Sequence, residues 1–257
     1  LQKRADDQEP GADVDAVAAT ASHNRPPRWL RTFEAFADTN FRWFFASLFS
    51  GFASMNIQMF IRGWLVFEIT GSYEKLGWMS AAGGIVGLFA APAGGVLADR
   101  IRQKKHVLQI CQLFNGLVAL GIALLIWDGT LQFVHLLAAS VLQGVSMNAM
   151  MPARQALTKD VVGLSRLTNA IALNSSGMNV ARLLLPGLAG GMVAALGGGG
   201  GDIEPVKWVY VLITSLYLLG ALVLVKVTVS DRQDTGLPKV PMLSELAAGF
   251  RYVLNTP

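Results

Sequence analysis

The chain has 257 residues, of which 53% are hydrophobic and only 15% are charged, and its formal net charge is +4. Soluble domains carry roughly 25% charged residues, so the composition excludes an ordinary soluble protein and indicates a membrane chain. The single cysteine, Cys111, excludes an intramolecular disulfide, and the three histidines lie far apart in the sequence. No metal-ligand spacing occurs, so no metal or cofactor is expected.

Residues 1–40 are polar and contain several prolines and a cluster of acidic residues. Such a segment cannot bury enough apolar surface to fold, so we expect a disordered cytoplasmic tail. No signal peptide is visible, because the first long apolar run starts only after Phe41 and is too long for one.

Six apolar runs are long enough to cross a bilayer core, which takes about 20 residues at 1.5 Å each. Most of them are apolar on all sides, whereas the helices of soluble proteins show a single apolar stripe. The predicted fold is therefore all-α and transmembrane, with a six-helix bundle over residues 41–229. The spans are expected at about residues 44–67, 76–98, 107–127, 133–151, 170–196 and 208–229.

Lysine and arginine are distributed unequally over the segments that connect these runs. Seventeen of the 21 fall in the N-terminal tail, the second and fourth connections and the segment after the sixth run, whereas only Lys75 and Lys207 fall on the opposite side. The positive-inside rule then places the N-terminus in the cytoplasm and predicts a multi-pass protein of the cell (inner) membrane. This topology accounts for the basic charge, so no nucleic-acid partner is expected.

A stripe of small residues leads to a charged turn at the end of the second run. The small residues recur every four positions and therefore share one helical face, which lets a second helix approach closely. Continuing that spacing leads to Asp99, which we expect to lie against a neighbouring helix. By itself the Asp99–Arg100 pair is equally consistent with an interfacial stop signal. The stripe comprises Gly83, Gly87, Ala91 and Gly95.

The turn lies in "GGVLADRIRQKK", residues 94–105, which resembles the signature of the loop between helices two and three in the major facilitator superfamily. Arg102 stands where that signature has glycine, and the arginine of the superfamily's fourth helix, which would fall near Ser140, is absent. Other segments resemble the branch that contains the enterobactin and macrolide exporters. They are "FEITGSYEKLGWM", "MMPARQALTKDVV", "RLTNAIALNSSGMNVARLLLPGLAGG" and "LSELAAGFRYVLNTP".

The resemblance implies a twelve-helix fold, of which this chain is the N-terminal six-helix half, with residues 230–257 as a cytoplasmic linker toward the C-terminal half. It implies a secondary active transporter rather than an enzyme: a proton-coupled antiporter that exports amphipathic, drug-like or siderophore-like molecules by alternating access. The partners would be membrane lipid, the substrate, protons and the C-terminal half. Pro186 corresponds to the kink in the exporters' fifth-helix motif. The gate residues would be Gly95, Asp99, Arg100 and Lys104.

Polar residues inside the spans are the candidates for a substrate cavity, because a mid-span arginine costs roughly 2.5–3.5 kcal/mol on insertion scales. Gln58 and Arg62 continue a polar stripe on the first span, and Asn179 and Arg182 lie on a similar stripe of the fifth. Two alternatives stay open. Arg62 can extend its head group to the membrane interface, and Arg182 can bond to carbonyls freed by Pro186.

The spans contain no aspartate or glutamate. The proton-coupling acid would therefore lie in the C-terminal half, or Asp99 would contribute, or the coupling differs. Three alternatives to the exporter are an uptake carrier on the same fold, a non-transporting scaffold or sensor, and a six-helix protein that works as a dimer.

Overall fold

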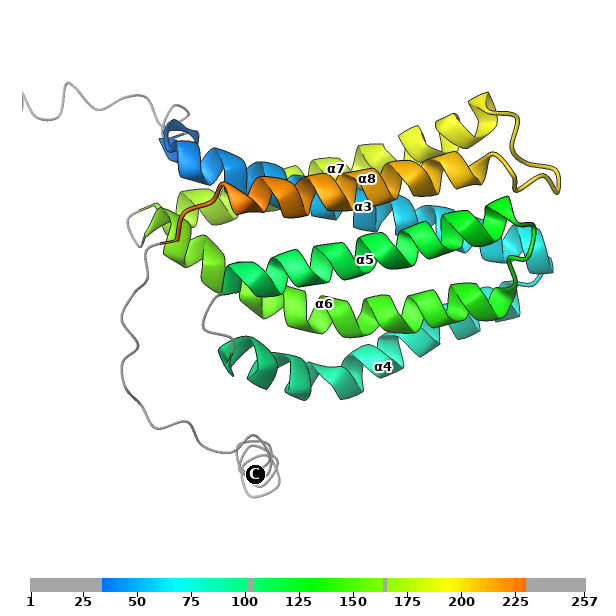
Figure 1. The fold of residues 1–257 in the computed structure, drawn as a ribbon, viewed down its shortest axis with the longest axis horizontal. Helices are drawn as coiled ribbons and strands as arrows, with labels where there is room; N and C mark the ends of the chain where they lie inside the picture. Colours follow the sequence, from blue (N-terminus) through cyan, green and yellow to red (C-terminus); the bar gives the residue numbers. More distant parts are fainter. Residues whose placement is uncertain (1–33, 101–103, 164–165, 230–257) are drawn as a thin grey trace, which may run out of the picture.

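A computed structural model describes residues 34–100, 104–163 and 166–229, with the side chains of α4 described up to Phe89 (Figure 1). The described chain is almost entirely helical. Its elements are η1 (Glu34–Ala37), α3 (Thr39–Thr70), α4 (Tyr73–Arg100), α5 (Lys104–Trp127), α6 (Phe133–Val162), α7 (Leu167–Ala195) and α8 (Val206–Val225). The predicted all-α transmembrane fold is confirmed.

Five of these helices, α3, α5, α6, α7 and α8, are long and apolar enough to cross a membrane. The helix α4 has 28 residues and coincides with the second predicted span, which stays a prediction. Most helix bounds differ from the predicted spans by only a few residues. The exception is α6, which runs to Val162, well past the predicted end at 151.

The described residues begin at 34, inside the predicted tail, which was expected to end at residue 40. Residues Glu34–Ala37 form a 3-10 helix in which Ala35 is fully buried. Asp38 then caps α3, since its side chain accepts a hydrogen bond from the backbone N–H of Asn40 at 2.8 Å. Residues 1–33 of the predicted tail and the predicted linker at 230–257 lie outside the described residues.

The helices α3, α5, α6 and α8 form the centre of the bundle, and α4 and α7 lie outside it. α4 packs mainly on α6 and α7 mainly on α3. In Figure 1 α4 follows one edge of the bundle, while α7 lies near the opposite edge. Much of the surface of both outer helices is exposed, for example Phe89 at 78% and Leu183 at 79%.

Polar contacts join α3 to α8 in the half of the bundle that contains the start of α3. The hydroxyl of Ser47 donates to the carbonyl oxygen of Gly220 at 2.7 Å, and that of Ser50 donates to the carbonyl oxygen of Leu216 at 2.6 Å. A Cβ at position 220 would lie 3.2 Å from the carbonyl oxygen of Ser47 and 2.9 Å from Gln112 Oε1. The absent side chain of Gly220 therefore permits the close approach of these helices.

The small-residue face of α4 lies against α6 over its described part. A Cβ at Gly83 would meet Ser140 Oγ at 2.8 Å, and one at Gly144 would meet the carbonyl oxygen of Gly83 at 2.7 Å. A Cβ at Gly87 would lie 3.4 Å from Asn148 Nδ2. The two helices thus meet backbone to backbone, as the spacing of Gly83 and Gly87 predicts.

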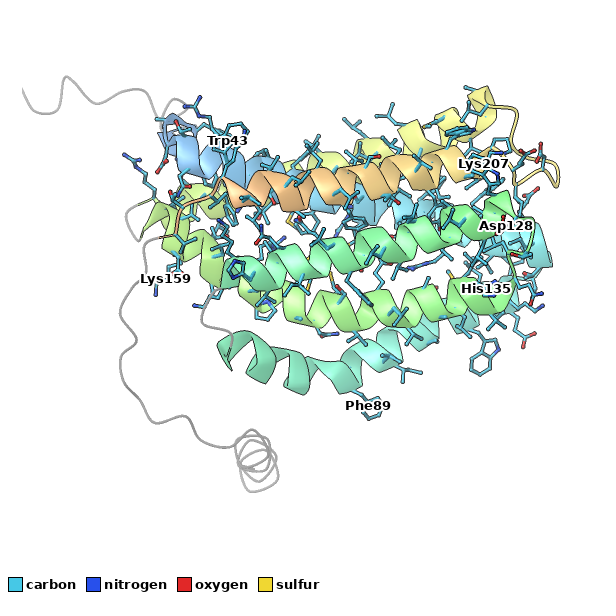
Figure 2. The ribbon with its side chains drawn as sticks, in the orientation of Figure 1. Trp43, Phe89, Asp128, His135, Lys159 and Lys207 are labelled. Atoms are coloured by element: carbon cyan, nitrogen blue, oxygen red, sulfur yellow. The ribbon has the colours of Figure 1, made fainter. Side chains whose placement is uncertain are left out.

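The connections sort to the two ends of the bundle. Figure 2 shows Trp43 and Lys159 near one end, and Asp128, His135 and Lys207 near the other. This alternation agrees with the predicted loop sides, in which the first two residues belong to the cytoplasmic end.

Candidate functional site

The predicted gate lies where α4 ends and α5 begins. Gly95, Asp99 and Arg100 belong to the last turns of α4, but their side chains lie outside the described residues. Lys104 is the first residue of α5, and its Nζ lies 3.9 Å from Asp160 Oδ2 near the end of α6. The structure thus ties the end of the charged turn to α6, while the gating role of these residues stays a prediction.

Gln58 lies in a polar cluster inside the bundle, formed by α3, α6 and α8. Its side chain is 1% exposed. Gln58 Oε1 accepts hydrogen bonds from Gln143 Nε2 at 3.0 Å and from the hydroxyl of Tyr217 at 3.4 Å. Gln143 Nε2 also lies 3.4 Å from that hydroxyl, so the three side chains form one connected network.

Arg62 lies one helical turn beyond Gln58 on α3, and its side chain is 8% exposed. This burial does not fit an arginine that extends to the membrane interface. Neither Nε nor Nη1 has a hydrogen-bond partner, and the hydroxyl of Tyr210 nearby is also buried without one. Tyr210 and Tyr217 both lie within electrostatic range of the guanidinium. Buried polar groups normally have a hydrogen-bond partner, so a cluster with three buried polar atoms that lack one is unusual.

The other two cavity candidates do not join this cluster. Asn179 and Arg182 lie on α7 and are exposed, because α7 turns a different face, with Ala181 and Ala189, toward the bundle. α7 continues through Pro186 to Ala195, and that proline is half-buried. Its role as a kink stays a prediction.

Comparison with known proteins settles the family. The model of the Major Facilitator Superfamily matches residues 43–257. The chain belongs to this superfamily. A 3-(3-hydroxy-phenyl)propionate transporter of Escherichia coli (strain K12) is 33% identical over 138 residues, which are 52% of this chain. The matched stretch spans only 30% of that relative's length.

Members of the superfamily are secondary transporters that span the membrane several times, and the multi-pass membrane location holds for this chain. No three His, Cys, Asp or Glu side chains come close enough to hold a metal ion within the part of the chain that the structure describes.

Sequence reasoning missed the two tyrosines of the cluster. Tyr210 and Tyr217 are seven residues apart on α8, which places them on one helical face. That spacing was the available signal, but a tyrosine in a membrane span is also typical of the interface. The sequence gives only a weak signal for Gln143, because amides in spans more often join helices than bind ligands.

Proposed function

We propose that this chain is half of a secondary transporter that exports amphipathic small molecules in exchange for protons, by alternating access. The match of residues 43–257 to a superfamily of secondary transporters carries the proposal. Export, proton coupling and the inner membrane with a cytoplasmic N-terminus are its finer parts. Export is supported by the resemblance around Pro186, and the orientation by the distribution of lysine and arginine.

The exposed polar face of α7 supports a second half that packs near it. Arg182 lies in the middle of this apolar helix and is exposed, as are Asn179 and Ser175. An arginine at this depth is too costly to leave in lipid, so its face must meet a water-filled cavity or another protein segment. A water-filled cavity between two halves of a transporter would provide such surroundings for Arg182.

The charged turn is the proposed gate between these halves. In this mechanism Asp99 and Arg100 pair with groups of the C-terminal half when the cytoplasmic side is closed, and the pairs separate as the halves rock. Lys104 supports this arrangement by its position beside Asp160 at the end of α6. Gly95 would permit the close approach of helices just before the gate.

The cargo is proposed to be an amphipathic molecule, drug-like or siderophore-like. The relative from Escherichia coli is named for a small aromatic acid, which is amphipathic and provides a first compound to test. The α7 face with Asn179 and Arg182 and the cluster around Gln58 and Arg62 offer polar contacts in apolar surroundings, as such a cargo requires.

Flux in vesicles of known orientation tests the proposal. Inside-out vesicles that contain the full-length protein should accumulate 3-(3-hydroxyphenyl)propionate or another amphipathic compound of a panel when their interior is acidified. Collapse of the pH gradient should abolish the accumulation. Accumulation only in right-side-out vesicles would identify an uptake carrier instead, and no flux in either orientation would contradict the transporter proposal.

A further inference from the structure

The guanidinium of Arg62 is a buried cation for which the bundle provides no counter-charge. Two of its three nitrogens, Nε and Nη1, have no hydrogen-bond partner. No carboxylate of the described residues lies within 4.0 Å of it. Burying an unpaired charge costs several kcal/mol of folding free energy. A negatively charged group that pairs with the guanidinium would therefore offset much of this cost, and its binding would be favoured.

The groups around Arg62 supply no negative charge. The buried hydroxyl of Tyr210 is unpaired, although it lies within electrostatic range of the guanidinium. Gln58 Oε1 already accepts two hydrogen bonds, one from Gln143 and one from Tyr217, so it is not available as a partner for Arg62. The cluster therefore holds three unmet donors, two on Arg62 and one on Tyr210, and its side chains include no anion.

The surroundings strengthen the attraction for an anion. Ile57, Ile61 and Ile213 belong to the apolar core that encloses the cluster. In such a medium a charge interaction is several times stronger than in water. Gln143 is half-buried, so the polar network reaches the surface of the bundle on α6.

We infer that Arg62 and Tyr210 bind the carboxylate of an amphipathic substrate, while hydrogen bonds among Gln58, Gln143 and Tyr217 fix the side chains next to the site. The inference rests on the proposed function and names the substrate class: compounds with an acidic group at the end of an apolar body. The guanidinium matches a carboxylate in charge and shape, and a neutral amide of the same size lacks the charge.

The site lies toward one end of the bundle. Arg62 is eight residues before the end of α3 at Thr70, a distance of about 12 Å along the helix. Tyr210 is near the start of α8. Both therefore lie toward the end of the bundle that carries Lys207 in Figure 2, which is the predicted external end. The carboxylate would bind on the side at which an exported substrate leaves.

Equilibrium binding to the full-length protein in detergent tests the inference, with 4-phenylbutanoate and its neutral amide, 4-phenylbutanamide, as probes near neutral pH. The acid should bind roughly ten- to a hundredfold more tightly than the amide, the range of a charge-assisted hydrogen bond. Arg62→Gln should remove this preference, because it weakens binding of the acid much more than binding of the amide, whereas Arg62→Lys should retain part of the preference. Tyr210→Phe should weaken acid binding about two- to tenfold. The matched control is Arg42→Gln, an exposed arginine on the same helix that bonds to Thr39.

Several results would overturn the inference. Equal affinity of the wild-type protein for acid and amide, or no binding of either, excludes a carboxylate site. Loss of both affinities to the same extent in Arg62→Gln indicates a structural role instead. If Arg62→Gln does not fold, the acid-to-amide ratio of the wild type and of Tyr210→Phe decides the matter. A chloride-dependent rise in melting temperature that requires Arg62, without acid preference, identifies an inorganic anion site. In each case flux of neutral amphipathic compounds in the vesicle assay would leave the transporter itself intact.

Discussion

The contact between α4 and α6 predicts that one glycine of the bundle tolerates no side chain. A Cβ at Gly144 would lie 2.7 Å from the carbonyl oxygen of Gly83, whereas real Cβ contacts essentially never fall under 3.0 Å and ordinary ones begin at 3.4 Å. The obstacle is backbone, which cannot rotate away as a side chain can. Gly144→Ala must therefore separate the two helices by roughly 0.3 to 0.7 Å, with a loss of packing along the contact.

The magnitude follows from two opposing terms. Overpacking of this kind costs typically about 1–3 kcal/mol. Replacing a mid-helix glycine by alanine returns about 0.5–1 kcal/mol, because glycine loses more backbone freedom on folding. Gly121→Ala on α5 is the matched control, since a Cβ there meets nothing within 4 Å and only the favourable term remains. The two variants should differ by about 1–3 kcal/mol.

Thermal unfolding of the full-length protein in detergent, followed by circular dichroism, measures this difference. By the scaling of globular domains of this size it corresponds to about 2–12 °C, with Gly144→Ala the lower. Equal melting temperatures for Gly144→Ala and Gly121→Ala would refute the reasoning, because α4 and α6 could then not meet backbone to backbone.

A rescue experiment separates a backbone obstacle from a side-chain one. A Cβ at Gly83 would meet Ser140 Oγ at 2.8 Å, but its next contact, with the carbonyl oxygen of Ser140, is an ordinary 3.5 Å. Ser140→Ala should therefore restore much of the stability that Gly83→Ala loses, less the hydrogen bond from Ser140 to the carbonyl oxygen of Met79. The same substitution should not restore Gly144→Ala.

Three further predictions concern the gate, the cavity and the ends of the helices. Asp99→Asn should reduce transport at least tenfold while membrane insertion, followed by protease protection, stays normal; unchanged flux would remove Asp99 from the gate. Arg182→Ala should change the order in which a panel of compounds is transported, whereas a uniform loss of folded protein would favour a structural role. Lys105→Met should lower the free energy of unfolding by about 1 kcal/mol. The reason is that Lys105 Nζ donates to the carbonyl oxygens of Val225 and Val227, at 2.8 and 2.6 Å, where α8 ends. An unchanged melting temperature would show that these hydrogen bonds contribute nothing to stability.

Hydropathy predicted which segments form helices better than where each helix ends. The fourth run loses its apolar character at Pro152, and Arg154 and Lys159 follow, so the span was predicted to stop at 151. The helix nevertheless continues to Val162. The backbone hydrogen bonds of a helix do not depend on apolar side chains, so the helix can continue through charged residues. Arg154 lies in this extension and packs over the ring of Phe52 at 4.6 Å.

The spacing of polar residues within one helix predicted a shared face but not what that face contacts. Gln58 and Arg62 were expected to continue a polar stripe on the first span. Nearer the start of that helix, Ser47 and Ser50 bond to the carbonyl oxygens of Gly220 and Leu216 on α8. Those acceptors belong to the main chain more than 160 residues later. A pattern of side chains cannot predict these acceptors, because every residue has a backbone carbonyl group. Sequence spacing can therefore give the direction of such a stripe, while its role depends on which helix packs there.

The two arginines inside the spans show why the candidate site needed the structure. Arg62 and Arg182 each follow a polar stripe on an otherwise apolar helix, and their spacing does not show which of the two the bundle encloses. In the bundle Arg62 is 8% exposed beside Tyr210 and Tyr217, whereas Arg182 is exposed on α7. The difference arises because α3 is central and contacts α8, α7 and α6, while α7 packs mainly on α3. The buried Arg62 should favour ligands that carry a negative charge. The exposed Arg182 should instead affect which compounds contact the outer face of α7. The binding assay on Arg62 and the transport profile of Arg182 therefore test separate parts of the mechanism, and one can fail without the other.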